Sequence, residues 1–121
     1  MDDYGISDRA LLQGGIIMKI LAIDKILPDA TSEEILNNLP EEARAVWGLY
    51  QKGFVREMYF RTEGTPGAVL ILECEDIEHA RMVVSTLPLV KKNLIDFDLY
   101  ALGFYAPLAT LFAEDKKETE E

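Results

Sequence analysis

The extended segments of this chain are apolar on both of their faces. Side chains alternate between the two faces of a β-strand, so a strand with one solvated face alternates apolar and polar residues. The runs "ILAI", "AVLIL" and "LYAL" instead carry apolar residues at both parities. A sheet made of such strands needs a cover on each face, yet a chain of 121 residues builds only one core of its own.

A helical pattern follows the first apolar strand, residues 16–24. Thr31 and Glu34 have capping-box spacing, an apolar stripe recurs at helical intervals after them, and Gly53 supplies a stop. Pro40 interrupts the stripe and is followed by two acids, as at a fresh helix start. The sequence therefore predicts either one bent helix or two consecutive pieces.

Two further strands, a helix and a last strand complete the order. Residues 54–61 and 67–75 are expected strands, joined by "TEGTP", which suits a short hairpin connection. Asp76 caps a helix whose apolar residues recur up to Leu87, where Pro88 ends it. The apolar run "DFDLYAL" is the final strand.

This β-α-β-β-α-β order predicts an α+β, ferredoxin-like fold with a four-stranded antiparallel sheet. Right-handed crossovers place both helices on one face of that sheet. The other face then needs a partner, and a second copy of the chain is the simplest one. We therefore expect a dimeric α+β barrel, formed by a homodimer or a multiple of dimers packed sheet against sheet.

The ends of the chain differ from its middle. We expect one domain over residues 16–112, a flexible extension over 1–15, and an acidic disordered tail over 113–121. Met18 directly precedes "KILAID", which leaves open that translation starts there. No apolar run approaches 18 residues and no signal-peptide pattern is present, so we expect no membrane span and a cytoplasmic protein.

Charge and residue counts exclude several classes of function. A net charge of −10 argues against nucleic-acid binding, which needs a basic surface. The single cysteine, Cys74, lies in an apolar run and is expected to be a buried, inert thiol. His79 is the only histidine and fits a solvent-facing or cap-region position better than a catalytic one. No metal site and no cofactor are expected.

Three segments carry a resemblance to a known family. The runs "LYQKGFVREMYFR", "DIEHARMVVSTLPL" and "DFDLYAL", with Gly53 and Arg56 at a helix-to-strand junction and Leu87-Pro88-Leu89 after the second helix, resemble the muconolactone isomerase family of dimeric α+β barrel proteins. The resemblance covers roughly Met18 to Pro107. It implies a cofactor-independent isomerase or lyase acting on a small lactone or acidic metabolite.

Such a reaction needs a base beside a carbonyl group and a donor that holds the enolate charge. Asp24, at the end of the first strand, is the candidate base, although an aspartate there also fits a turn before Pro28. Tyr59 and Arg61 share a strand face with Glu57 and are candidates for polarising an oxyanion and binding a carboxylate. The alternative is that these charges only protect an edge strand from aggregation.

Two further residues are candidates for substrate binding. By strand parity Arg56 lies with Met58 and Phe60, where it would anchor an acidic ligand or pair across a dimer. Trp47 completes the stripe of the first helix or lines a ligand pocket beside Tyr50. Three functions stay open at this point: the isomerase or lyase, a non-catalytic dimeric small-molecule-binding or interaction module, and a cofactorless monooxygenase.

Overall fold

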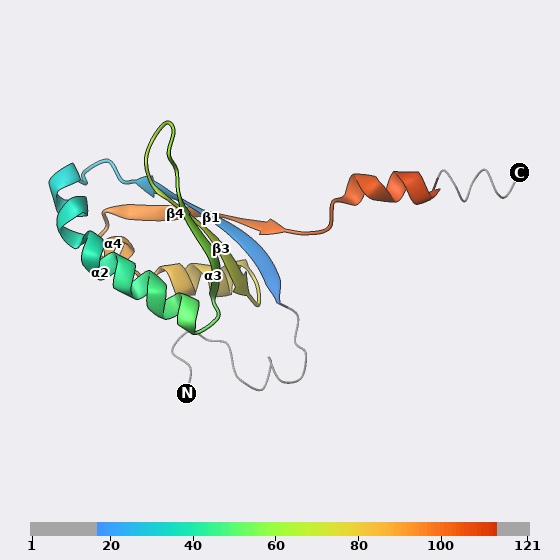
Figure 1. The fold of residues 1–121 in the computed structure, drawn as a ribbon, viewed down its shortest axis with the longest axis horizontal. Helices are drawn as coiled ribbons and strands as arrows, with labels where there is room; N and C mark the ends of the chain where they lie inside the picture. The colour runs from blue at the N-terminus through green and yellow to red at the C-terminus, as the bar shows by residue number, and fades with distance from the viewer. Residues whose placement is uncertain (1–16, 114–121) are drawn as a thin grey trace, which may run out of the picture.

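The computed structural model describes residues 17–113, and these contain the expected order of strands and helices (Figure 1). The elements are β1 (Met18–Ile26), α2 (Ser32–Gln51), β2 (Val55–Phe60), β3 (Ala68–Cys74), α3 (Ile77–Val84), α4 (Pro88–Lys91), β4 (Ile95–Leu102) and the 3₁₀ turn η1 (Ala106–Leu108). The extension over 1–15 and the tail beyond residue 113 lie outside the described residues.

The sheet has the strand order β2-β3-β1-β4, and each neighbouring pair is antiparallel. β1 lies between β3 and β4, as a split β-α-β arrangement requires, and β2 and β4 form the two edges. The helices gather on one side of the strands (Figure 1). The predicted α+β, ferredoxin-like fold is confirmed by this topology.

The first helix is one continuous element, α2, with Pro40 inside it. Both halves of the predicted capping box at Thr31 and Glu34 are present, and Gly53 follows the helix with a φ of +89°. Proline removes one intrahelical hydrogen bond. The apolar stripe on both sides of Pro40 packs against the core through Leu39 and Leu49, which explains why the chain continues as a helix.

The second helical region differs from the expectation. α3 ends at Val84 rather than at Leu87, and Pro88 opens the separate short helix α4 between α3 and the final strand. The hydroxyl of Ser85 donates to the Met82 carbonyl, and that of Thr86 donates to the Val83 carbonyl. These side-chain bonds satisfy carbonyl groups at the end of α3, and proline at N1 then suits a new helix start.

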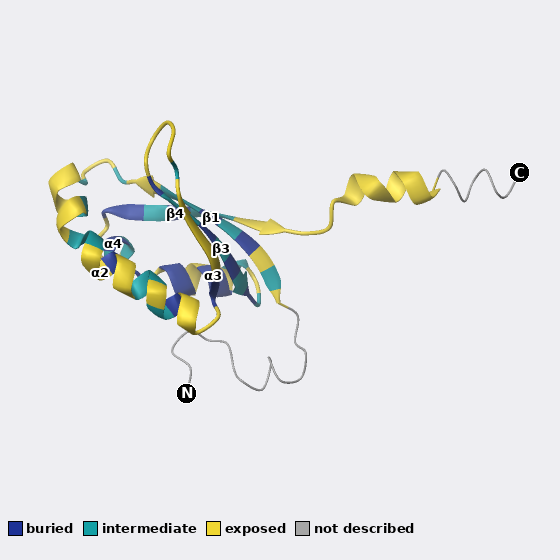
Figure 2. Cartoon of the chain, viewed as in Figure 1, coloured by how far each residue is buried: buried dark blue, intermediate teal, exposed yellow. Residues whose placement is uncertain are grey.

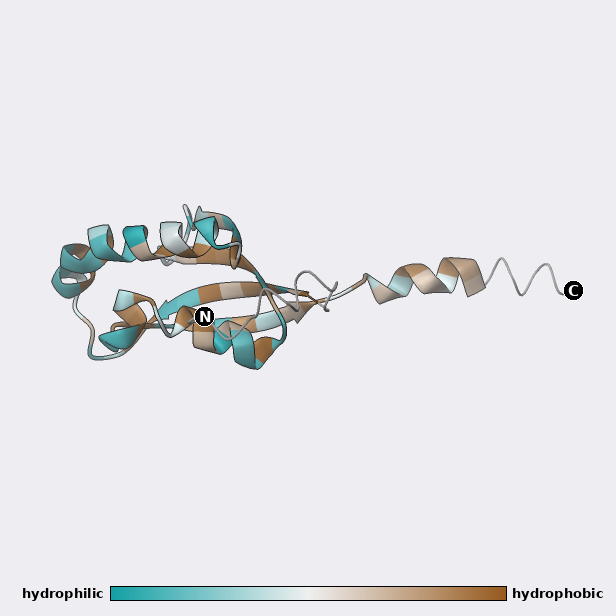
Figure 3. Ribbon diagram, turned by 90° about the horizontal axis from the view of Figure 1, so that it is seen from below, coloured by the Kyte–Doolittle hydropathy of each residue, from teal (hydrophilic) through white to brown (hydrophobic). Residues whose placement is uncertain are grey.

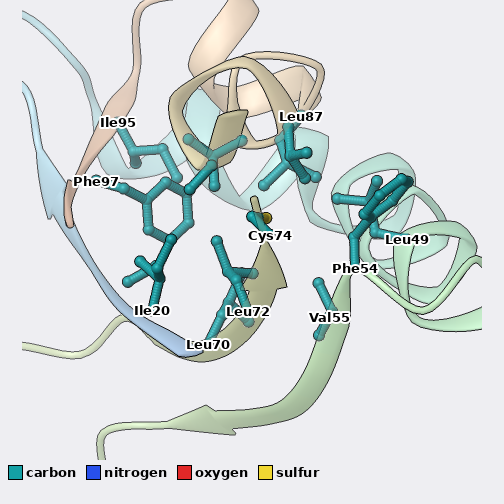
Figure 4. Packing of buried hydrophobic residues seen from close by; sticks show 14 of the residues in the cluster. Ile20, Leu49, Phe54, Val55, Leu70, Leu72, Cys74, Leu87, Ile95 and Phe97 are labelled. Atoms are coloured by element: carbon teal, nitrogen blue, oxygen red, sulfur yellow. The ribbon is translucent and has the colours of Figure 1, made fainter. Parts of the chain in front are cut away.

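The hydrophobic core lies between the helices and one face of the sheet (Figure 4). Ile20, Leu72 and Phe97 point from the strands toward Leu49 and Leu87. All five are at most 1% exposed. Cys74 is also buried here, as predicted, and burial raises the pKa of its thiol to about 12.

The opposite face of the sheet, which we call the open face, is apolar at its centre. Leu21, Ile23, Val69 and Ile71 lie at the alternate positions of β1 and β3 and are half-buried. Around them, exposed side chains stand on the edge strands: Tyr59, Tyr100 and Leu102, each at least 40% exposed. Figure 2 shows exposed and intermediate positions along the strands. A helix layer therefore covers one of the two apolar faces in the described chain.

The described chain continues beyond β4 as a segment that leaves the sheet. Residues 103–113 include η1 and a further helical turn, and they project away from the other elements (Figures 1 and 3). Among residues 17–113, no helix combines the length and the apolar character that crossing a bilayer requires.

Candidate functional site

An apolar cavity of about 490 Å³ lies between α2 and the β2 side of the sheet. Its wall is formed chiefly by Leu39, Ala43 and Val46 of α2 and by Met58 and Phe60 of β2. A second cavity of about 390 Å³ shares Asp24, Leu39, Phe60 and Leu89 with the first. Asp24 therefore lies where the two cavities adjoin, and it is the charged group that they share.

Asp24 lies inside β1, before the turn at Pro28. One carboxylate oxygen, Oδ2, accepts a hydrogen bond of 2.8 Å from the Ala68 backbone N–H, and Oδ1 lies 3.1 Å from Nη2 of Arg61. The side chain is only 10% exposed. Burial raises the pKa of Asp24, and the Ala68 N–H and the Arg61 guanidinium partly oppose that effect.

Arg61 follows β2 and ties the β2–β3 loop to the end of β1. Its Nε donates to the Thr65 carbonyl at 2.8 Å, and its Nη2 donates to the backbone carbonyl of Asp24 at 3.2 Å as well as to the carboxylate. The guanidinium thus positions Asp24. These contacts connect two elements that are 37 residues apart in the sequence.

Gly67 makes this close arrangement possible. It directly precedes β3, and a Cβ at this position would collide with the carboxylate of Asp24 and the guanidinium of Arg61. The carbonyl of Gly67 also accepts the Arg61 backbone N–H at 2.8 Å. The ion pair therefore sits directly over the glycine backbone, where a larger residue has no space.

Glu42 is a second buried carboxyl group in the first cavity, and we did not identify it from the sequence. It is 8% exposed, and its Oε1 accepts a 2.9 Å hydrogen bond from the Leu89 backbone N–H. Burial raises the pKa of Glu42; the charges of Asp24 and Glu41 raise it further, and the Leu89 bond opposes them. A sequence signal exists, because Glu42 falls at helical spacing between the stripe residues Leu39 and Val46.

Tyr59 is among the residues that line the first cavity, although the strand register places its side chain on the open face of the sheet. Its register partner is Val69, and its hydroxyl donates a 2.6 Å hydrogen bond to Glu57. The carboxylate of Glu57 raises the pKa of the Tyr59 phenol. Glu57 and Tyr59 therefore share a face as predicted, whereas the guanidinium of Arg61 does not join them and pairs with Asp24 instead.

Strand β2 contains a β-bulge beside Arg56. The pairing of β2 with β3 shifts between Val55 and Glu57, so that Met58 faces Leu70 and Phe60 faces Ala68. This extra residue returns Met58 and Phe60 to the helix-covered face and lets both line the cavity. Met58 and Phe60 share a face, as predicted, whereas Arg56 is exposed and lines neither cavity, so its position gives no support to the prediction that it binds substrate there.

Trp47 also lies outside both cavities. It is 53% exposed on α2 and stacks on Tyr50, with 5.1 Å between the ring centroids. The prediction that Trp47 binds substrate therefore has no support from its position. The cavity wall comes from the neighbouring stripe residues Ala43 and Val46.

The sequence predicted a solvent-facing or a cap-region position for His79. The side chain is buried, so the solvent-facing position is wrong. Its Nδ1 accepts a 3.1 Å hydrogen bond from the Glu75 backbone N–H, while its backbone N–H donates to the capping Asp76. Its ring meets Phe54 edge-on. His79 thus belongs to the cap of α3. Within residues 17–113, no cluster of three His, Cys, Asp or Glu side chains is arranged to hold a metal ion.

Comparison with known proteins adds little about function. No protein-family model matches the sequence, and no curated protein matches it. Among solved structures, the chain is similar to a dimeric protein of unknown function and ferredoxin-like fold from Bacteroides fragilis NCTC 9343. The identity is 16% and the TM-score 0.40, over 71% of this chain and 96% of the other. Values this low do not establish a common function or assembly, and the muconolactone isomerase resemblance stays a prediction.

Replacing Gly67 with alanine tests the packing around Asp24. We expect Gly67→Ala to lower the free energy of unfolding by about 1–3 kcal/mol, because the added methyl group displaces the Asp24–Arg61 pair. Gly48→Ala is the matched control: it lies inside α2 with open space around its Cβ and should raise stability by about 0.5–1 kcal/mol. Urea unfolding measures both. Equal effects of the two substitutions would contradict the close packing.

The raised pKa of Glu42 predicts a pH dependence of stability. The native carboxyl keeps its proton to higher pH than the unfolded one, so its contribution turns unfavourable as pH rises from the ordinary value of 4.5 through the raised pKa. Glu42→Gln keeps an acceptor for Leu89 and removes this titration. We expect wild type to lose stability relative to Glu42→Gln over that window. A pH-independent difference in urea unfolding would show that the carboxyl is not perturbed.

Proposed function

We propose that this chain is a muconolactone isomerase-like protein that binds a small, largely apolar molecule with a carbonyl group and moves a proton within it without a cofactor. The observation that carries the proposal is the pair of buried carboxyl groups, Asp24 and Glu42, at one apolar cavity. A cavity of about 490 Å³ is within the range that holds small ligands.

The two carboxyl groups are suited to different halves of a proton transfer. A general base works best when its pKa lies near the working pH, and burial moves Asp24 in that direction. Asp24 would take the proton beside the carbonyl group, and Glu42 would return a proton to another carbon of the same molecule. Asp24 then releases its proton to solvent and Glu42 takes one up from solvent, which restores the starting state. No electrons are gained or lost in this step, so the isomerisation needs no redox partner.

The electrostatics of the cavity favour a neutral substrate over an acidic one. Two carboxyl groups face the space, the chain carries a net charge of −10, and Arg61 is already paired with Asp24. An anionic ligand would meet repulsion at long range and no cation among the cavity-lining residues. A lactone is therefore a better candidate than a free acid.

A non-catalytic binding module is the second candidate function, and one observation favours it. Both oxygens of Asp24 already accept hydrogen bonds, and one oxygen of Glu42 holds the backbone of α4. These bonds make the carboxyl groups part of the structure as well as of the cavity. In this case the apolar walls bind a ligand and no bond in it changes.

Proton exchange distinguishes the two candidates. We expect the chain to speed exchange of the α-carbon protons of small lactones in deuterated water, followed by NMR, and Asp24→Asn to slow it by about 100-fold or more. Glu57→Gln, on the open face, is the control and should leave the rate unchanged. Ligand binding without exchange in wild type would favour the binding module, and neither binding nor exchange would reject both candidates.

We also propose that the open face pairs with the open face of a second copy, forming a homodimeric α+β barrel. The apolar centre of that face, with Leu21, Ile23, Val69 and Ile71, supports this, since a partner of the same chain supplies a complementary apolar surface. Near one end of the open face, Lys25 and Asp98 form a cross-strand ion pair of 2.8 Å, so their charges neutralise each other.

Light scattering after size exclusion tests the homodimer. We expect twice the mass of one chain for wild type, and Tyr100→Asp should shift the mass toward one chain, because it buries an unpaired charge in each half of the interface. Met82→Asp, on the exposed side of α3, is the control and should remain dimeric. A wild-type monomer at micromolar concentration would contradict the proposal.

A further inference from the structure

The segment after β4 is a second apolar surface that its own domain leaves uncovered. We call residues 103–113 the C-terminal arm. Every residue of the arm is exposed, and the large apolar ones are 42% to 70% exposed: Phe104, Tyr105, Leu108, Leu111 and Phe112. Figures 1 and 3 show the arm projecting from the end of β4, away from the sheet and helices.

The composition of the arm differs from that of the chain around it. Residues 99–113 contain no charged side chain, whereas 28% of the whole sequence is charged. Two copies that each carry a net charge of −10 repel one another at long range. An uncharged, apolar stretch is the part of such a chain that can enter a contact between copies without burying a charge.

The arm also needs packing to keep its helical form. Its helical part spans η1 and residues 109–113, about two turns, and isolated helices of that length are not stable in water. Most helical stability comes from burying an apolar face against another element. The sheet and helices of the same copy lie away from the arm, so another chain is needed to supply that element (Figure 3).

The arm is continuous with the open face. Tyr100 and Leu102 stand on the open face of β4 and lead directly through Gly103 into Phe104. Three extended and eight helical residues reach about 20 Å in all, and paired sheets lie about 10 Å apart. The arm is thus long enough to cross from its own sheet to a second copy paired through the open face.

The geometry points to an exchanged arm: the C-terminal arm of each copy packs on the second copy of a homodimer, at the rim of the paired open faces. This inference rests on the proposed homodimer and names the C-terminal arm as a segment that stabilises it. The apolar side chains of the arm become buried only in the assembly. The arm contributes to the strength of dimerisation and not to the core of one copy, because none of its residues is buried there.

Substitutions in the full chain test the contribution of the arm to dimerisation. We expect the triple variant Phe104→Ser, Leu108→Ser, Phe112→Ser to weaken the dimer by 100-fold or more in analytical ultracentrifugation. The matched control replaces three exposed apolar residues on the helices, Leu36→Ser, Tyr50→Ser and Met82→Ser, and should leave the dissociation constant within about threefold. Circular dichroism checks that both variants keep the native fold.

Spin labelling shows on which copy the arm lies. Thr110→Cys takes a nitroxide label selectively, since Cys74 is buried. Labelled copies are mixed with unlabelled copies that carry ¹⁵N, and the broadening of amide signals then reports contacts between copies. We expect broadening near Tyr59 and Tyr100 of the ¹⁵N copies. A second sample, in which the spin-labelled copies also carry ¹⁵N and are diluted with unlabelled chain, reports contacts within one copy. If amide signals broaden only in this second sample, the arm folds back on its own copy and the inference is overturned.

The outcomes separate the arm from the dimer. A wild-type dimer that the arm variant weakens, with broadening between copies, supports the exchanged arm. A wild-type dimer that the arm variant leaves equally strong overturns the exchanged arm and leaves the open-face homodimer standing. A wild-type monomer overturns both.

Discussion

The rest of this structure depends on one constraint: the sheet is apolar on both faces, but the helices cover only one of them. The helices bury Ile20, Leu72 and Phe97 on one face, while the centre of the other face stays apolar and uncovered in a single copy. The strand order β2-β3-β1-β4 places β2 at the edge under α2, where helix and sheet separate enough to leave a cavity. The cavity and the proposed partner surface thus lie on opposite faces of the same sheet.

The cavity owes its chemistry to two carboxyl groups that also hold backbone in place. Asp24 bonds to the N–H of Ala68 beside the last β1–β3 pair, and Glu42 satisfies the N–H of Leu89 at the start of α4. Burial in apolar surroundings favours the protonated form of both groups. The same bonds therefore fix the geometry of the site and keep each group at the apolar wall.

The sequence predicted the fold well because its signals are local. Capping at Thr31, the stop at Gly53 and the apolar runs define the elements, and their order limits the topology. The site was predicted only in part. Asp24 was singled out from its position at a strand end, and strand parity placed Met58 and Phe60 on one face and Glu57 and Tyr59 on the other, as the register has them. The bulge between Val55 and Glu57 could not be predicted, because one inserted residue does not change an apolar pattern recognisably. The partners of Arg61 depend on the packing of β1 against β3, which the sequence of β2 alone does not contain.

The protonation of the two cavity carboxyl groups is the property that the proposed chemistry needs most. Their side-chain carboxyl carbons can be followed individually by ¹³C NMR across pH, with Asp24→Asn and Glu42→Gln to assign the signals. Burial at the cavity predicts titration midpoints above the ordinary values of 3.8 for Asp24 and 4.5 for Glu42. Midpoints at or below those values would show that both groups are ordinary surface carboxylates and would contradict the proposed site.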